Sequence, residues 1–137
     1  MIIQFCLLAM MSLSCATPNT KDSIDSKDVA SIEIQNQTNN LNIPNKIVLN
    51  DHSSIASIVT EVNRLTPIIS YTPNLKANTG LYSMLIRFND HSYKHFDINY
   101  TIYDGVIIQG NDGLLMNKYY KNNQLEILVL SLFIERK

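Results

Sequence analysis

The chain has 137 residues, of which 45% are hydrophobic, and its formal net charge at pH 7 is −1. That length is enough for one domain with a sizeable core. The 11 lysines and arginines form no cluster, so the chain lacks the basic patch by which proteins bind nucleic acid. We therefore expect no nucleic acid among its partners.

The first fifteen residues have the layout of an export signal. The apolar run from Ile2 to Met11 is too short for a membrane-spanning helix, which needs about 20 residues. It fits the apolar core of a signal peptide, which is about 7–15 residues long and is followed by small residues. Small residues do follow, and they lead to Cys15. The segment resembles the signal peptide of small bacterial lipoproteins.

This resemblance implies that residues 1–14 are removed and that Cys15 carries a lipid on its thiol. The protein would then be anchored on the outside of the inner membrane or on the periplasmic side of an outer membrane. By the same resemblance, Ala16 after the cysteine favours the outer membrane. Ser12 stands where such signals prefer leucine, and no lysine or arginine precedes the apolar run. The alternatives are an ordinary cleaved secretory signal and a buried N-terminal strand or helix.

The cysteines agree with this domain organisation. Cys6 would leave with the signal, so the mature chain would keep one thiol and form no internal disulfide, although an envelope compartment permits them. Residues 15–28 are polar and nearly free of large apolar side chains, which predicts a disordered tether. Residues 29–137 are then expected to form a single domain.

The first half of that domain predicts two strands and a helix. Apolar and polar residues alternate in Val29–Gln35 and in Lys46–Leu49, as in half-buried strands. From Asp51 to Leu65 the apolar residues recur with helical spacing, and Asp51 can cap the first turn. Pro67 follows, and the residue before a proline is disfavoured in a helix.

The second half predicts further strands and a final helix. The strand segments are Leu81–Phe88, Tyr93–Ile102, Val106–Gln109 and, as a last short strand, Leu114–Tyr120. Asp104-Gly105 predicts a hairpin turn, because glycine tolerates positive φ. Helical spacing of apolar residues predicts a helix over Gln124–Arg136. A loop over Ile68–Thr79 precedes these strands, and loops of this length often carry function.

The element order β-β-α-β-β-β-α predicts an α+β fold. The simplest way to bury the apolar stripes is an antiparallel sheet of about five strands with the two helices packed on one face. This order looks like that of small bacterial lipoproteins with compact α+β domains. No motif in it carries a function.

Three histidines and the aspartates near them are the candidate metal ligands. They are His52, His91 and His95, with Asp51, Asp90 or Asp97. Imidazole and carboxylate suit zinc or copper, but the spacing is not that of a HExxH helix. The tetrapeptide Asn-Asp-His-Ser occurs twice and is also typical of turns and helix caps. We therefore predict structural roles for these residues, and neither a bound metal nor a cofactor.

Catalysis is not predicted either. Asp51-His52-Ser53 has the residue types of a catalytic triad, but adjacent residues cannot converge as a triad requires. The four glycines are scattered, so no glycine-rich phosphate loop is present in the sequence.

Tyrosines are the candidate partner-binding residues. Tyrosine is enriched at binding surfaces because it offers a broad apolar area and a hydroxyl group. Those at expected strand ends or loops are Tyr71, Tyr93, Tyr103, Tyr119 and Tyr120; alternatively, they cover the edges of the core. The sequence favours a non-catalytic envelope lipoprotein that binds another envelope protein, as an inhibitor, immunity factor or assembly part. A periplasmic lipoprotein that binds a small molecule or a metal is the alternative.

Overall fold

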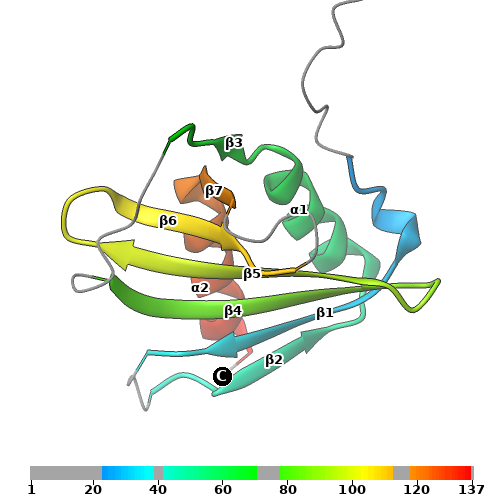
Figure 1. The fold of residues 1–137 in the computed structure, drawn as a ribbon. Coiled ribbons are helices and arrows are strands. Elements are labelled where there is room, and N and C mark those ends of the chain that lie inside the picture. Colours follow the sequence, from blue (N-terminus) through cyan, green and yellow to red (C-terminus); the bar gives the residue numbers. More distant parts are fainter. Residues whose placement is uncertain (1–22, 39–41, 71–77, 113–117, 137) are drawn as a thin grey trace, which may run out of the picture.

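The computed structural model describes residues 23–38, 42–70, 78–112 and 118–136, and over these residues the fold is α+β, as predicted (Figure 1). It has one sheet of seven strands and two α-helices. The strands are β1 (Val29–Asn36), β2 (Lys46–Leu49), β3 (Thr66–Pro67), β4 (Asn78–Phe88), β5 (Tyr93–Thr101), β6 (Gly105–Gly110) and β7 (Lys118–Lys121). The helices are α1 (His52–Asn63) and α2 (Asn123–Glu135), and a short 3-10 turn, η1 (Ser26–Asp28), precedes β1.

The strands lie in the order β2-β1-β4-β5-β6-β7-β3, and all neighbouring strands are antiparallel. The expected number of about five strands is too low by two, because the sheet also includes β7, which the sequence predicts only as a last short strand, and β3, which has only two residues and pairs with β7. A segment that short shows no alternation. Its Pro67 is tolerated because β3 is an edge strand, where a missing backbone N–H breaks no ladder.

The core lies between one face of the sheet and both helices, which Figure 1 shows on the same side of the sheet. Alternate residues of the strands point into it, including Ile32 on β1, Met84 on β4 and Phe96 on β5. From α2, Phe133 is fully buried and stacks on Tyr82, with 5.5 Å between the ring centroids. The prediction that both helices pack on one face is confirmed.

Helix α1 begins where the sequence predicts. The Asp51 side chain accepts a hydrogen bond from the Ser54 backbone N–H at 2.8 Å and caps the first turn. The helix ends at Asn63, two residues before the predicted end, and Leu65 is buried beyond it. In the described part of the chain, neither helix is long and apolar enough to cross a membrane.

The folded domain begins earlier than the predicted boundary at Val29. Residues 23–28, here called the strap, pack on the domain through Ile24, which is only 8% exposed. Asn63 of α1 accepts from the Ile24 N–H at 2.9 Å and donates to the Ile24 carbonyl at 2.8 Å. One isoleucine in a polar segment is a weak sequence signal, so the expected tether was too long at this end.

The strap also joins the turn between β4 and β5. Asn89 donates its side-chain N–H to the Lys27 carbonyl and its backbone N–H to the Asp28 carbonyl, both at 2.9 Å. Because of these two bonds, the chain enters the domain at the end of the sheet that carries this turn. His91 in the same turn has a positive φ of 69°, a conformation that costs an L-residue some energy.

Candidate functional site

The three histidines among the candidate metal ligands are not brought together. His52 is the first residue of α1, His91 lies in the β4–β5 turn and His95 lies on β5. Among the residues that the structure describes, no group of three or more histidine, cysteine, aspartate or glutamate side chains could hold a metal ion. Asp51 caps α1, and Asp90 accepts hydrogen bonds from the backbone and hydroxyl of Ser92.

Asp51, which caps the start of α1, also forms an ion pair with Arg136 at the end of α2. Its second carboxylate oxygen lies 3.0 Å from Nη2 of Arg136, at the end of α2. The hydrogen bond from the Ser54 backbone and then the Arg136 guanidinium lower the pKa of Asp51 below its usual 3.8. The ionised carboxylate therefore favours the folded state.

An Asp51→Asn variant tests this pKa shift. A carboxyl group with a lowered folded-state pKa stabilises the fold above its unfolded-state pKa, and this contribution is lost as the pH falls through the folded-state value. We expect urea unfolding to show the native protein as more stable than Asp51→Asn at neutral pH, with the difference disappearing as the pH falls through 3.8 and below. Asp28→Asn, at an exposed position that caps no α-helix, is the control. A difference that stays constant down to acid pH would contradict the assignment.

A polar cluster lies on the sheet face that turns away from the helices. It consists of Ser83 on β4, His95 and Asp97 on β5, and Asn111 after β6. The ring nitrogen Nε2 of His95 lies 2.7 Å from the Ser83 hydroxyl and 3.3 Å from a carboxylate oxygen of Asp97. The Asn111 side chain donates to the other Asp97 oxygen, and its backbone N–H donates to the His95 carbonyl.

This cluster has the residue types of a catalytic triad but a different geometry. In a triad, the aspartate and the serine engage opposite nitrogens of the histidine, so that the histidine can take the serine proton while the aspartate orients it. Here Ser83 and Asp97 share the same nitrogen of His95. The arrangement therefore ties β4, β5 and the end of β6 together, rather than preparing Ser83 for attack.

Sequence alternation places His95 and Asp97 on one face of their strand, and the structure confirms this. From the sequence, His95 and Asp97 are candidates only as metal ligands. Nothing in it marks Ser83 and Asn111 as the residues that bond to them. Ser83 comes from a neighbouring strand, and its register opposite Asp97 cannot be read from one strand alone. The only sequence signal was that Ser83 lies on the more polar side of β4.

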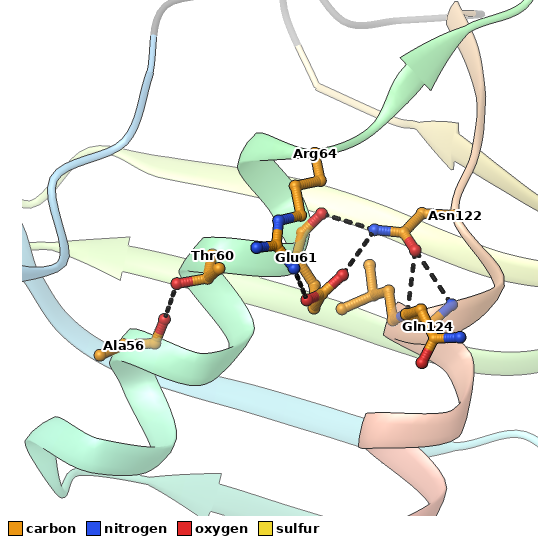
Figure 2. A network of polar contacts seen from close by, with 7 residues as sticks. Ala56, Thr60, Glu61, Arg64, Asn122 and Gln124 are labelled. Atoms are coloured by element: carbon orange, nitrogen blue, oxygen red, sulfur yellow. Dashed lines mark hydrogen bonds and ion pairs between the residues drawn. The ribbon is translucent and has the colours of Figure 1, made fainter.

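A second polar network joins the helices (Figure 2). Asn122 caps α2, accepting from the Gln124 backbone N–H at 2.9 Å. Its side-chain N–H groups donate to the backbone carbonyl of Glu61, at 2.8 Å, and to the Glu61 carboxylate, at 3.0 Å. Glu61 also pairs with Arg64 at 2.9 Å. The end of α1 is thereby fastened to the start of α2.

Replacing Asn122 with alanine is expected to lower the free energy of unfolding by about 1–2 kcal/mol, because the helix cap and the bonds to Glu61 are lost together. Urea denaturation at neutral pH measures this loss. Asn123→Ala is the matched control, because Asn123 is the exposed first residue of α2 and does not cap it. Equal losses in the two variants would contradict the role given to Asn122.

The tyrosines predicted to bind a partner differ in exposure. Tyr93 and Tyr103 are 56% and 75% exposed, and Tyr119 is half-buried. Tyr120 is only 5% exposed, so the prediction that it faces a partner is wrong; burial raises the pKa of its hydroxyl. Its ring belongs to the core because β7 continues the sheet over the helices. Tyr71 lies outside the described residues.

The turn between β5 and β6 carries a concentration of exposed apolar side chains. Tyr100, Ile102 and Tyr103 are 47%, 71% and 75% exposed. Alternation over Tyr93–Ile102 puts Tyr100 and Ile102 on the same side as Phe96 and Ile98, which are buried, but Tyr100 and Ile102 are exposed. Strand β5 ends at Thr101, so Ile102 lies in the turn, and Tyr100 stands exposed at the end of the strand. We call residues 100–105 the hairpin tip.

A shallow hollow of about 350 Å³ lies between the strap and the β4–β5 turn. Ile24 and Phe88 contribute apolar surface, and the polar lining includes Asp25, Asp28, Asp90 and Lys94. Small-molecule sites usually have volumes of about 300–1,000 Å³. The hollow is therefore large enough to be the site of the alternative ligand-binding function, as are two other hollows of about 470 and 370 Å³ in the described part of the chain; this one is preferred because it combines two large apolar side chains with several charged ones.

Comparison with known proteins identifies no relative. No protein-family model, no curated protein and no solved structure matches the chain. The functional evidence therefore comes from the placement and chemistry of the chain's own residues.

Proposed function

We propose that this protein is a lipid-anchored, non-catalytic module of the bacterial cell envelope that binds another envelope protein. The apolar run and Cys15 support the anchor, because they match the signal peptide of small bacterial lipoproteins. The anchored domain stands outside the inner membrane, or on the periplasmic side of an outer membrane. An inhibitor, an immunity factor and an assembly part all fit this description.

The observation that carries the proposal is the placement of the chain entry and the hairpin tip at opposite ends of the sheet (Figure 1). The strap is bonded to the turn that precedes β5, and the hairpin tip begins where β5 ends. A strand of nine residues spans about 27 Å. The exposed apolar side chains of the hairpin tip are thus held away from the point of attachment.

The length of chain between the anchor and the strap adds to this picture. Cleavage before Cys15 leaves the eight residues 15–22 ahead of the strap, which reach at most about 29 Å when extended. One end of the domain therefore stays near the membrane, while the other is available to a neighbour in the envelope.

The polar cluster supports a non-catalytic role. The His95 nitrogen that faces Ser83 also faces Asp97, so a proton on this nitrogen is shared between two acceptors. The histidine links two strands, and Asp97 is not placed to orient it through the opposite nitrogen as a catalytic triad requires.

The test is capture of the full-length, lipidated chain with a C-terminal tag from its own cells, after cross-linking in the intact envelope. The proposal expects one envelope protein in stoichiometric amount. Mass spectrometry of the mature N-terminus and release of the domain as a folded fragment provide the controls for lipidation and folding. A lipidated, folded chain that captures nothing above background would contradict the proposal.

The alternative proposal is a lipoprotein that carries a small molecule, with the hollow beside the strap as its site; for a metal, the described residues offer no group of three or more ligands. A ligand that binds only the native state raises the melting midpoint. Small cationic solutes suited to the three aspartates of the hollow should then raise the midpoint, and Asp28→Asn should reduce that rise. An unchanged midpoint with these ligands would contradict the alternative.

A further inference from the structure

We propose that the hairpin tip is the docking element of this module, and that its partner is a protein with an apolar cleft that receives Ile102 and Tyr103. The inference rests on the proposed function, and it names the surface and the chemistry of the partner site. Scattered exposed apolar residues are normal on a soluble domain. Here, in contrast, three such side chains fall among the four residues from Tyr100 to Tyr103, so the exposed apolar residues are concentrated in one turn.

The hairpin tip is tied by bonds within the domain itself. Thr101 is buried, and its hydroxyl accepts from the Asp104 backbone N–H at 2.9 Å. Gly105 supplies the positive φ, 71°, that closes the turn. Tyr100 is paired on both sides, with Thr79 of β4 and Val106 of β6. Binding through the tip therefore orders little chain, which lowers the entropic cost of association.

The residue types suit a protein cleft. Tyrosine is frequent among the few interface residues that provide most of the binding energy, and such residues fill well-packed pockets on the partner. Ile102 and Tyr103 are adjacent in the chain, so a cleft that takes both would remove the two most exposed apolar side chains of the tip from water. This burial is the favourable term in most protein association.

A lipid surface is the less favourable partner. Surfaces that bind anionic lipid combine apolar side chains with lysine or arginine. Residues 99–109 contain neither, and the only formal charge in that stretch is the negative charge of Asp104. The strap, which leads to the anchor, lies at the opposite end of β5.

A second copy of the chain is also less favourable, because the described hollows do not offer an apolar cleft. The hollow beside the strap has two apolar lining residues, Ile24 and Phe88, among aspartates, serines, an asparagine and a lysine. The hollow between α1 and α2 has two apolar lining residues, Ile127 and Leu128, among polar ones that include Glu61 and Gln124. Neither matches two large apolar side chains.

The experiment places a photo-cross-linking benzoylphenylalanine at Tyr103 of the full-length lipidated chain in its own cells. Tyr93 is the matched control position, because it is also an exposed tyrosine and begins the same strand at the strap end. We expect a single protein adduct from position 103, at a yield about tenfold or more above that from position 93, because contact energy concentrates in a few central residues.

Each other outcome overturns the inference. An adduct to lipid alone would mean that the tip meets the membrane, and an adduct of twice the chain's own mass would mean that it meets a second copy. Equal protein adducts from both positions would place the interface elsewhere while leaving the proposed function intact. A chain that neither cross-links from either position nor captures a protein would contradict the proposed function as well.

Discussion

Replacing Phe133 with alanine is expected to lower the free energy of unfolding by about 3–5 kcal/mol. Phe133 is fully buried in the last turn of α2, and its ring stacks on Tyr82 with a centroid separation of 5.5 Å and an interplanar angle of 19°. Alanine would leave a cavity between α2 and the sheet that neighbouring side chains cannot fill without moving. Domain stabilities are typically about 5–15 kcal/mol, so this one change removes a large part of the total. Urea denaturation at 25 °C measures it.

Ile134→Ala is the matched control, because Ile134 follows Phe133 on the same helix and is 56% exposed. Replacing an exposed side chain, with the buried face of the helix unchanged, usually changes the free energy of unfolding by about 0.5 kcal/mol or less. The placement of α2 would be wrong if the two variants lost equal stability, because the helix would then be turned differently on the sheet.

The second large effect is expected from Cys15→Ala. Each buried methylene of a lipid anchor contributes about 0.8 kcal/mol to membrane binding, and stable anchoring needs more than one chain. A chain without the thiol cannot accept the lipid, so we expect loss of fatty-acid label and accumulation of the unprocessed precursor. Labelling with radioactive palmitate and the mass of the mature N-terminus measure the two effects.

Cys6→Ala is the control for Cys15→Ala, because the resemblance places Cys6 inside the segment that is removed. That variant should keep its label and be processed normally. Unchanged label and processing in Cys15→Ala would reject the lipid anchor, and the remaining readings of the first fifteen residues would be a secretory signal or a buried segment.

Most of the fold could be predicted from the sequence because its elements carry strong periodic patterns. Alternation located β1, β2, β4, β5 and β6, and helical spacing with a cap located α1. The strap and β3 were missed because a single buried Ile24 and a two-residue strand show no period. Both are ordered by bonds to distant residues, such as the one between Ile24 and Asn63, which a local pattern cannot show.

The candidate site was less predictable, because the exposure of a side chain depends on how all the elements of the domain pack together. Alternation assigns Tyr100 and Ile102 to the core face of their strand, but it does not tell where the strand ends or how far the core extends along it. For Tyr120 the difference is in the other direction. Its expected place is at the surface, but it is buried because β7 lies between β6 and β3 in the sheet. The turn at Asp104-Gly105, in contrast, was predictable because its geometry depends on local residue types.

The most direct test of the central claim compares quantitative capture of the partner by four full-length variants. Ile102→Ser and Tyr103→Ser change the hairpin tip, and Ile127→Ser and Ile134→Ser remove comparably exposed apolar side chains from α2. The account predicts that either tip variant captures less of the partner by about tenfold or more, while both α2 variants capture it as the native chain does. Undiminished capture by both tip variants would contradict it.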